Sequence, residues 1–424
     1  MARRTGQLKL GAFFHPTGNH VASWLHPDSQ IDAGTNFRHY VELAQTAERG
    51  KFDLMFLRDN PATRDGNLDA LKRWPQYMVY FEPTTLMAGI AALTQRIGLV
   101  ATATASHNEP YNIARRIASL DLISNGRAGW NVVTSSNRSE FDNFGGMAPK
   151  DHDVRYERAR EFVEVCRGLW DSWDDDAFVR DRDTALYFDP QKLHYLHHKG
   201  THFTVRGPLN VARPPQGHPV LANAGMSEVG KDFAAEIAEI LFSPLNTLAE
   251  AQVMYADMKG RVEKFGRHPD HLKIMPGLNA IVGRSEAEAE EKHQRLQALI
   301  HPDVGRQLLA TELADLDLST YPVDGPLPYD LIGDDAPVAA RRLAEKAKRE
   351  NLSIRDLYLW FGGARGQRTI KGTPQRIVDE MEEWFLKDGV DGFLIQPAWL
   401  PGGLTEFVDM VVPELQRRDL FRRE

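Results

Sequence analysis

Glycines, a hydroxyl and a lysine are spaced in the segment GMSEVGKD (residues 225–232) in a way that suits a phosphate group. In a triphosphate-binding loop, GxxxxGK is followed by Ser or Thr, whose hydroxyl ligates magnesium. Asp232 holds that place here and would face phosphate oxygens, so ATP and GTP are disfavoured. A strand is expected to end at Gly225 and a helix to begin near Ser227, which leaves free N–H groups for an anion. Ser227 is then either a plain helix cap or a cap that also donates to phosphate.

Polar side chains also follow other apolar runs: Asp59 in FLRDN, Thr104 in ATATASHNEP and Asn131 in WNVVTSS. Any one of them alone suits a turn. If the runs are parallel strands of a barrel, the side chains should share one face, because the carboxyl ends of such strands open at the same end. No GxGxxG follows a strand at the start of a βαβ unit, so the usual dinucleotide fingerprint is missing. A mononucleotide with one phosphate remains open.

Histidines supply further candidates. His20, which stands with Trp24 in GNHVASWLHP, could donate a hydrogen bond or take a proton near neutral pH. The alternative is a histidine whose hydrogen bonds are satisfied within a loop. The run HYLHHKGTH (residues 194–202) has the imidazoles of a zinc site, but it has no Cys and no well-spaced carboxylate partner. No metal site is predicted.

Short apolar runs rich in β-branched or aromatic residues recur along the chain, with helical patterns between them. The predicted strands are 8–14, 53–59, 97–105, 128–135, 219–225, 239–244, 274–283 and 391–398. The clearest predicted helices are 36–50, 110–124, 156–170 and 373–389, the last with Thr373 as N-cap and Pro374 as its first residue. The repeats predict an α/β fold, a closed (β/α)8 TIM barrel, with an open doubly wound sheet as the alternative.

Two segments do not fit the repeat. Residues 174–218 are polar and rich in turn formers, and residues 300–368 separate the seventh strand from the eighth. Long ordered loops are often functional, so we expect both to lie as insertions over the C-terminal face of a single domain spanning 1–424.

Composition limits the class of protein. The formal net charge of −8 gives no positive field to hold a polyanion, so nucleic acid is not an expected partner. Cys166 is the one cysteine, which excludes an internal disulfide and suits a reducing compartment. No run of about 18 apolar residues could cross a membrane, and the N-terminus lacks a signal peptide. These features predict a soluble cytoplasmic protein.

Many ordered blocks carry a family resemblance. They are GNHVASWLHP, FDLMFLRD, EPTTLMAGIAALTQRIGLVATAT, EPYNIARRIASLDLISNGRAGWNVVTS, the HxxxY of HDVRYERAREF, AGMSEVGKDFAAEIAEILFS and DGFLIQPAWLPGGLTEFVDMVVPELQRRDLFR. Together they span nearly the whole chain. The sequence resembles the bacterial-luciferase-like flavin monooxygenases, in the branch of nitrilotriacetate monooxygenase component A with the EDTA, dibenzothiophene-sulfone and long-chain alkane monooxygenases.

The resemblance implies a luciferase-like barrel that binds reduced FMN from a separate NAD(P)H flavin reductase. Such a barrel oxygenates a small organic substrate with O2 through a flavin C4a-peroxide. By position, flavin contacts are expected from Asp59, Thr104, Asn131, His152, Tyr156, Met226 and Ser227, with His20 and His152 as the catalytic candidates. Relatives are commonly oligomers, so a homodimer or homotetramer is expected. A barrel using the deazaflavin F420 and a non-catalytic flavin-binding barrel are the alternatives.

One departure from the family pattern concerns the substrate. The family commonly has FLAD where this chain has FLRD, which places Arg58 beside Asp59. Arg58 either faces outward without consequence or alters the charge preference for substrate. The sequence does not identify the substrate beyond an organosulfur, amine, aminocarboxylate or alkyl compound.

Overall fold

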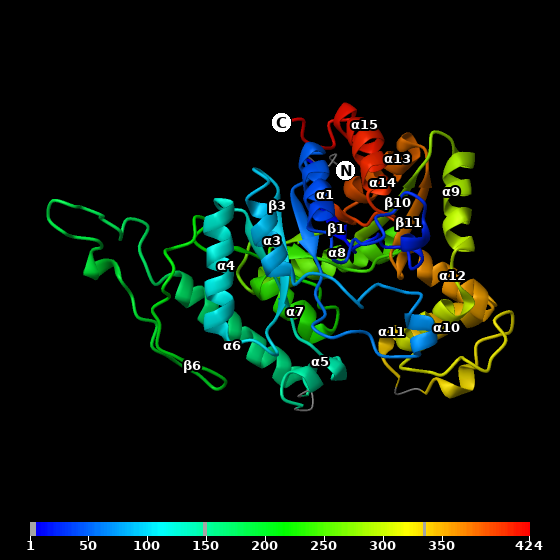
Figure 1. Cartoon of the computed structure of the whole chain (residues 1–424), viewed down its shortest axis with the longest axis horizontal. Coiled ribbons are helices and arrows are strands. Elements are labelled where there is room, and N and C mark those ends of the chain that lie inside the picture. The colour runs from blue at the N-terminus through cyan, green and yellow to red at the C-terminus, as the bar shows by residue number, and fades with distance from the viewer. Residues whose placement is uncertain (1–5, 147–150, 334–335) are drawn as a thin grey trace.

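The computed structural model of the protein describes residues 6–146, 151–333 and 336–424 (Figure 1). Its centre is a barrel of parallel strands surrounded by helices. The barrel strands are β1 (Lys9–Phe14), β2 (Leu54–Leu57), β3 (Gly98–Thr104), β4 (Ala128–Val133), β7 (Val220–Asn223), β8 (Ile240–Leu241), β9 (Lys273–Ile274) with β10 (Gly277–Val282), and β12 (Gly392–Ile395). All eight predicted strands are therefore present.

The barrel closes through its seventh strand, which is made of β9 and β10. β9 pairs with β8, β10 pairs with β12, and β12 pairs with β1, all in parallel. Pro276 separates β9 from β10 because proline has no N–H for the ladder, although its carbonyl still accepts from the Leu394 N–H at 2.9 Å. The closed (β/α)8 barrel is confirmed, and the open sheet is excluded.

Helices cover the outside of the barrel and cap its ends. They are α1 (Phe37–Arg49), α2 (Leu68–Leu71), α3 (Pro83–Ala91), α4 (Pro110–Ser124), α5 (Arg138–Asn143), α6 (His152–Trp170), α7 (Glu228–Ile237), α8 (Leu248–Lys264), α9 (Glu286–Ala298), α10 (Pro302–Glu312), α11 (Val338–Arg349), α12 (Ile354–Ala364), α13 (Pro374–Leu386), α14 (Gly402–Glu406) and α15 (Val412–Arg417). The predicted helix 110–124 matches α4 residue for residue, and Thr373 caps α13 as predicted by accepting from the Arg376 N–H. α6 begins four residues before the predicted position 156.

Two apolar layers stabilise the barrel. The larger lies between the strands and the helices, and its fully buried side chains include Trp130, Phe162 and Phe233. The smaller fills the barrel interior, where the ring of Phe13 stacks on Phe56 at 5.2 Å and on Phe242 at 5.3 Å. This aromatic layer closes the barrel below its C-terminal mouth, so a ligand there meets a packed floor rather than a pore. Within the described residues, no helix is long and apolar enough to span a bilayer.

The segment 174–218 does not lie over the mouth, and that part of the prediction is wrong. It follows helix α6 and precedes strand β7, and a helix-to-strand connection emerges away from the C-terminal face. It carries β5 (His198–Lys199) and β6 (Thr204–Val205), and it rests on the outer helices. The Tyr111 hydroxyl of α4 donates to the Pro208 carbonyl at 3.3 Å, and Phe203 packs on Phe162 of α6. Figure 1 shows the stretch of this segment that precedes β6 projecting away from the barrel.

The second insertion does reach the mouth, because it separates a strand from the helix that follows it. That helix is α13, whose buried face packs on the barrel core. The insertion runs from the end of β10 to the start of α13, so it begins before residue 300 and includes α9. It also contains a strand that the sequence pattern did not predict, β11 (Arg368–Gly372), which pairs in parallel with β10. A separate apolar cluster stabilises α10, α11 and α12 against the loops after β1 and β2.

Candidate active site

A cavity of about 560 Å³ opens at the carboxyl ends of the barrel strands. Its floor is the aromatic layer of Phe13, Phe56 and Phe242. Its polar wall comes from the ends of β1 to β4, and one side comes from the second insertion. The wall residues used below are His15, Asn19, Arg58, Asp59, Thr104, Asn131, Ala224, Glu312, Phe361, Arg365, Gln367 and Gln396. The position matches the end of the barrel where βα-loops build active sites.

Asp59 stands on this wall directly after β2. Its Oδ1 accepts from the Asn60 N–H at 2.9 Å. The pKa of Asp59 is raised to about 6, chiefly by burial and also by the nearby carboxylates of Glu82 and Glu140. The Asn60 hydrogen bond and the charge of Arg58 oppose this increase. The carboxyl group therefore changes protonation state near neutral pH. It can accept a hydrogen bond above that pKa and donate one below it.

Thr104 and Asn131 face the same cavity from β3 and β4. The Thr104 hydroxyl oxygen accepts from the Ser106 N–H at 3.1 Å and from the Ser135 hydroxyl at 2.8 Å, so it fixes the loop after β4. The Asn131 Nδ2 donates to the Thr102 hydroxyl at 2.9 Å, while its buried Oδ1 has no hydrogen-bond partner in the described residues. A buried acceptor without a partner costs stability, so this oxygen is suited to a ligand N–H.

The predicted phosphate seat forms at the start of α7. Ser227 caps the helix, and its Oγ accepts from the Gly230 N–H at 3.1 Å. The first N–H groups of a helix have no intrahelical acceptor, so those of Glu228 and Val229, unlike that of Gly230, are available to an anion. His152, the first residue of α6, places its Nε2 3.0 Å from the Ser227 Oγ. The side chain of His152 is 43% exposed, so an entering ligand can reach it.

Two glycines make room for the Tyr156 hydroxyl in this seat. A Cβ at Gly225 would lie 2.9 Å from that oxygen, and a Cβ at Gly230 would lie 2.7 Å from it. The ring of Tyr156 is buried, 5.0 Å from the imidazole of His152 and 5.6 Å from Phe233. The seat therefore has the shape that a small oxyanion requires: backbone N–H groups, two hydroxyls and an imidazole around a turn without side chains.

The lysine of GMSEVGKD faces away from this seat. The Lys231 Nζ lies 2.7 Å from a Glu228 carboxylate oxygen and 3.0 Å from an Asp257 carboxylate oxygen. Asp232 pairs with Arg261 at 2.6 Å. A triphosphate loop needs its lysine on the phosphates, so the geometry agrees with the sequence argument against ATP and GTP.

The structure separates the predicted residues into two adjoining groups. Asp59, Thr104 and Asn131 line the cavity, while His152, Tyr156, Met226 and Ser227 gather at its edge. Ala224 connects the two groups, because it lines the cavity and lies two residues before Met226 in the turn. One elongated ligand with an anionic end could therefore occupy both.

His20 does not join either group. Among the described residues that line the cavity, Asn19 is present and His20 is not. The side chain of His20 is 1% exposed, and its Nδ1 accepts from the Ala22 N–H at 3.1 Å. Burial lowers the pKa of His20 to about 3, so the ring is neutral near pH 7. These observations argue against the predicted catalytic role, and Trp24 likewise points elsewhere, donating to the Arg73 carbonyl at 2.9 Å.

The residues 194–202 turn to different partners. The His194 Nε2 lies 2.9 Å from Asp174, and the His198 Nε2 lies 3.0 Å from Glu161 of α6. Glu161 also accepts from two backbone N–H groups of the hairpin, so this contact anchors the segment to α6. No group of three or more His, Cys, Asp or Glu side chains in the described ranges could hold a metal ion.

Several wall residues were not predicted from the sequence. His15 follows the first strand directly and could have been found by the same rule that selected Asp59. Arg365 and Gln367 come from the end of α12, inside the second insertion, where no periodic pattern indicates which side chains face the barrel.

Burial lowers the pKa of His15 well below its usual value, and Arg365, Arg58 and Arg64 lower it further, so this histidine is neutral.

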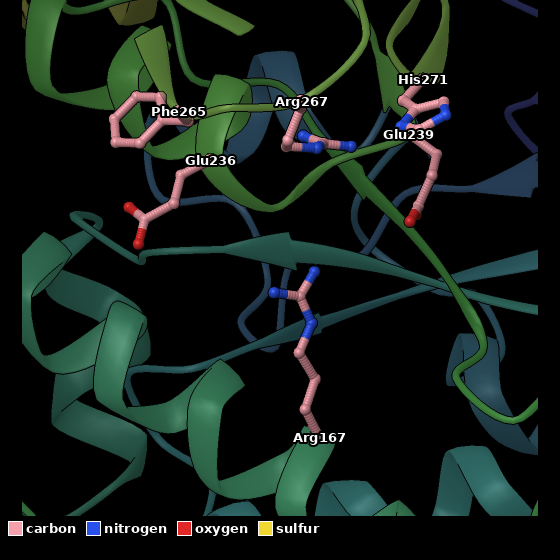
Figure 2. Close-up of a pocket in the computed structure, with 6 residues that line it drawn as sticks. All are labelled: Arg167, Glu236, Glu239, Phe265, Arg267 and His271. Carbon is pink, nitrogen blue, oxygen red and sulfur yellow. The ribbon is translucent and has the colours of Figure 1, made fainter. Parts of the chain in front are cut away.

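A second cavity, of about 680 Å³, lies at the opposite end of the barrel (Figure 2). Arg167, Glu236, Glu239, Phe265, Arg267 and His271 line it. Glu239 directly precedes β8 and His271 lies two residues before β9, so the cavity is at the N-terminal ends of the strands. None of the predicted site residues contributes to it. In barrels of this type, residues at the N-terminal end usually stabilise the fold, and catalysis takes place at the C-terminal end.

Comparison with known proteins covers nearly the whole chain. It is 48% identical over 426 residues to the N-acetyl-S-(2-succino)cysteine monooxygenase of Bacillus subtilis (strain 168), with 100% of this chain and 95% of that protein aligned. It is 45% identical over 425 residues to nitrilotriacetate monooxygenase component A of Aminobacter aminovorans, with 99% and 94% aligned. The crystal structure of a riboflavin lyase with modified FMN and riboflavin has a TM-score of 0.87 and 30% identity, covering 98% of this chain and 93% of that one.

A family model supports the same conclusion. It is described as luciferase-like monooxygenase and matches residues 13–392. The match includes every barrel strand except the first residues of β1 and the last residues of β12. The chain belongs to the luciferase-like monooxygenases.

Proposed function

We propose that the protein is an FMNH2-dependent monooxygenase of a two-component system, which uses O2 to oxygenate a small organic molecule. The observation that carries this proposal is the phosphate seat at the edge of the cavity, where His152, Tyr156 and Ser227 surround the turn before α7. The donors of this seat suit a single phosphate, and a planar ring system attached to it would extend past Ala224 into the cavity.

The residues of the site suit FMN in particular. The seat supplies N–H groups and hydroxyls for the phosphate, and the free Oδ1 of Asn131 supplies an acceptor for a ring N–H. Asp59 and Thr104 complete the polar wall beside the ring. When bound, reduced FMN supplies the electrons that activate dioxygen, so that one oxygen atom enters the substrate and the other leaves as water.

The protein's own part is to hold the cofactor, exclude water and place the substrate. The aromatic floor and Phe361 from the insertion give the cavity apolar surfaces that limit water. Asp59 is the group on the wall best matched to proton transfer near neutral pH, because its pKa is raised to about 6. His152 contacts Ser227 in the seat, so we assign it to phosphate binding and orientation rather than to the reacting end.

A separate reductase would supply the reduced cofactor. One relative is named as component A of a monooxygenase, which implies a second component for that enzyme. We infer that an NAD(P)H:FMN reductase serves this chain in the same way, and that the contact between them is transient. A homodimer or homotetramer, and a cytoplasmic location, remain predictions.

The test compares cofactors and then follows oxygen. Anaerobic titration of the protein with FMNH2, riboflavin and reduced F420 should show FMNH2 binding at least about tenfold more tightly than riboflavin, because the seat holds the phosphate. With a flavin reductase, NADH and 18O2, a panel of sulfides, sulfones, amines and carboxylates should then yield one 18O-labelled product by mass spectrometry. Preference for F420 would favour hydride transfer instead, and FMN binding without any labelled product would leave a binding protein.

A further inference from the structure

Three arginines gather around one aromatic ring beside the cavity. The guanidinium carbon of Arg58 lies 4.7 Å from the ring centroid of Tyr77, that of Arg64 lies 4.9 Å away and that of Arg365 lies 5.5 Å away. Arg64 also lies 3.6 Å from the ring centroid of Trp74. The arginines come from the end of β2, from the loop that follows it and from the end of α12. Two separate parts of the chain therefore meet to bring three positive charges together.

Among the described residues, the cluster has no close anion, because no ion pair within 4.0 Å involves any of the three arginines. Glu312 lies on the same cavity wall and acts on Arg64 and Arg365 only from a longer distance. The Arg64 Nη1 and the Arg365 Nε and Nη2 are buried without a hydrogen-bond partner in the part of the chain that the structure describes. Charged groups taken out of water are normally paired, because each unpaired one loses its hydration without compensation. The three like charges also repel one another across a short distance.

The titratable neighbours offset the three charges only in part. Glu312 acts on Arg64 and Arg365, and Asp59 follows Arg58, but neither carboxylate forms an ion pair with these arginines within 4.0 Å. His15, which the three arginines surround, is neutral because burial and the arginines lower its pKa. The Tyr77 hydroxyl is buried and finds no hydrogen-bond partner within residues 6–146, 151–333 and 336–424. Burial also lowers the pKa of Arg64 to about 9 and lowers that of Arg365. A guanidinium group nevertheless keeps its proton in proteins. Tyr77 itself has φ of 66°, a left-handed conformation that a tyrosine rarely adopts and that concentrates at functional sites.

We propose that this cluster, defined by Arg58, Arg64 and Arg365, binds the substrate, and that the substrate is a small organic molecule with at least two carboxylate groups. One carboxylate pairs best with one guanidinium, so three guanidinium groups without a close ion pair in the described residues are matched by two or three carboxylates. Arg58 and Arg365 line the cavity, so they meet the ligand, and Arg64 adds its charge from beside them. The planar guanidinium fork matches a carboxylate in two parallel hydrogen bonds.

The position of the cluster would place the substrate in the cavity, away from the phosphate seat. Arg58 directly precedes Asp59 on the same strand end, and Arg365 lies two residues before Gln367 on the opposite wall. The phosphate seat is supplied by α6 and α7, which contribute none of the three arginines. The two anion sites are therefore distinct parts of the molecule, and an organic polycarboxylate would occupy one while a phosphate occupies the other. This inference rests on the proposed function, since it names the substrate class of the same site.

The test uses the full chain and tricarballylate as the probe, with trimethyl tricarballylate as its uncharged match. In calorimetric titrations, with and without bound FMN, tricarballylate should bind saturably and the ester should not. Arg365→Met and Arg64→Met should each weaken tricarballylate binding at least tenfold. Arg138→Met is the control, because Arg138 is exposed on nearby α5 and pairs with Asp142 at 2.9 Å, and it should change nothing. Equal binding of acid and ester, no binding of the acid, or unchanged binding in both cluster variants would overturn the proposal.

Thermal melting of the same variants excludes a purely structural role. Replacing an unpaired buried cation by methionine should leave the melting temperature equal or higher. Lower melting temperatures together with unchanged tricarballylate affinity would assign the arginines to folding and end the proposal. FMN titration is read separately. If FMN fails to bind while tricarballylate binds as expected, the proposed function fails and the anion site stands; if FMN binds and tricarballylate does not, the reverse holds.

Discussion

The two ends of the barrel hold cavities of similar size and similar residue types, but they differ in whether their polar groups have hydrogen-bond partners within the protein. At the N-terminal end, Arg267 donates to the Ala235 and Ala238 carbonyls, each at 2.7 Å, and Arg167 donates to the Ile237 carbonyl at 3.0 Å. These carbonyls end α7 and have no intrahelical donor. The arginines of that cavity (Figure 2) are therefore used by the fold itself.

At the C-terminal mouth the corresponding groups are left without partners. Asn131, Gln367 and Gln396 each have a buried amide oxygen with no hydrogen bond in the described residues, and Arg64 and Arg365 have buried N–H groups in the same state. Native proteins keep few such groups, because each one costs stability unless a ligand or water satisfies it. Cavity volume does not distinguish the two ends, since the N-terminal cavity is the larger, whereas hydrogen-bond satisfaction does.

The largest expected effect comes from closing the phosphate seat at the mouth. Gly230→Ala places a Cβ against the Tyr156 hydroxyl, at 2.7 Å in the present geometry, so the tyrosine must leave the seat. We expect the Kd for FMN to rise about 100-fold, which corresponds to about 2.7 kcal/mol. The matched control is Gly260→Ala in α8, where a Cβ would meet nothing within 4 Å. Fluorescence titration with FMN checks both, and an unchanged Kd in the Gly230 variant would remove the seat from the proposed function.

The reverse pattern is expected at the N-terminal end. Arg267→Met removes the donors of two carbonyls at the end of α7, so the free energy of unfolding should fall by about 2 kcal/mol. The affinity for FMN should stay within twofold of the unchanged protein. Urea denaturation gives the first quantity and FMN titration the second. A variant with lost FMN binding and unchanged stability would contradict the inference that the N-terminal end stabilises the fold and the C-terminal end binds the ligand.

Asp59 gives a smaller effect that depends on pH. Its folded-state pKa of about 6 lies above the unfolded value of 3.8, so the folded state binds the proton more tightly. Stability from this group is present at low pH and is lost as pH rises through the folded-state pKa. Between pH 5 and pH 7 the loss should be about 1.3 kcal/mol. Asp59→Asn should lack this component, so we expect its unfolding free energy to fall less over the same range. Urea denaturation measures the unfolding free energy of both proteins at each pH. If this free energy changed with pH equally in the two proteins, the pKa of Asp59 would not be raised in the folded state.

How much could be predicted from the sequence follows from the same comparison. The strands are apolar runs with turn residues at their ends, so the barrel was predictable from this pattern. The family was predictable from the resemblance of many ordered sequence blocks, and both predictions are confirmed. Polar residues at strand ends were found because position alone makes them face the mouth. We did not select His15, although the same rule applies to it. The rule does not apply to Arg365, because the direction of that side chain depends on how the second insertion folds. The position of His20 was not predictable either, because its loop turns inward and buries the ring.

The path of the first insertion could also have been derived. Its predicted neighbours were a helix before it and a strand after it, and such a connection cannot emerge at the C-terminal mouth. The second insertion required more, because α9 resembles a barrel helix in the sequence, and only the packing of α13 on the barrel core shows that α13 completes the seventh unit. Periodicity identifies a helix but not the layer to which it belongs.

The smallest expected effect concerns Lys231, which lies in the phosphate-seat segment but is used by the fold, as the arginines at the N-terminal end are. Its Nζ is held between Glu228 and Asp257, at 2.7 Å and 3.0 Å, and the side chain is only 15% exposed. Lys231→Met should therefore change the Kd for FMN less than twofold and lower the free energy of unfolding by about 0.5–1 kcal/mol. FMN and ATP titrations of both proteins measure this directly. If the substitution weakened FMN binding tenfold, the lysine would have to swing onto the phosphate when the cofactor binds, and partner satisfaction in the free protein would no longer separate fold residues from site residues.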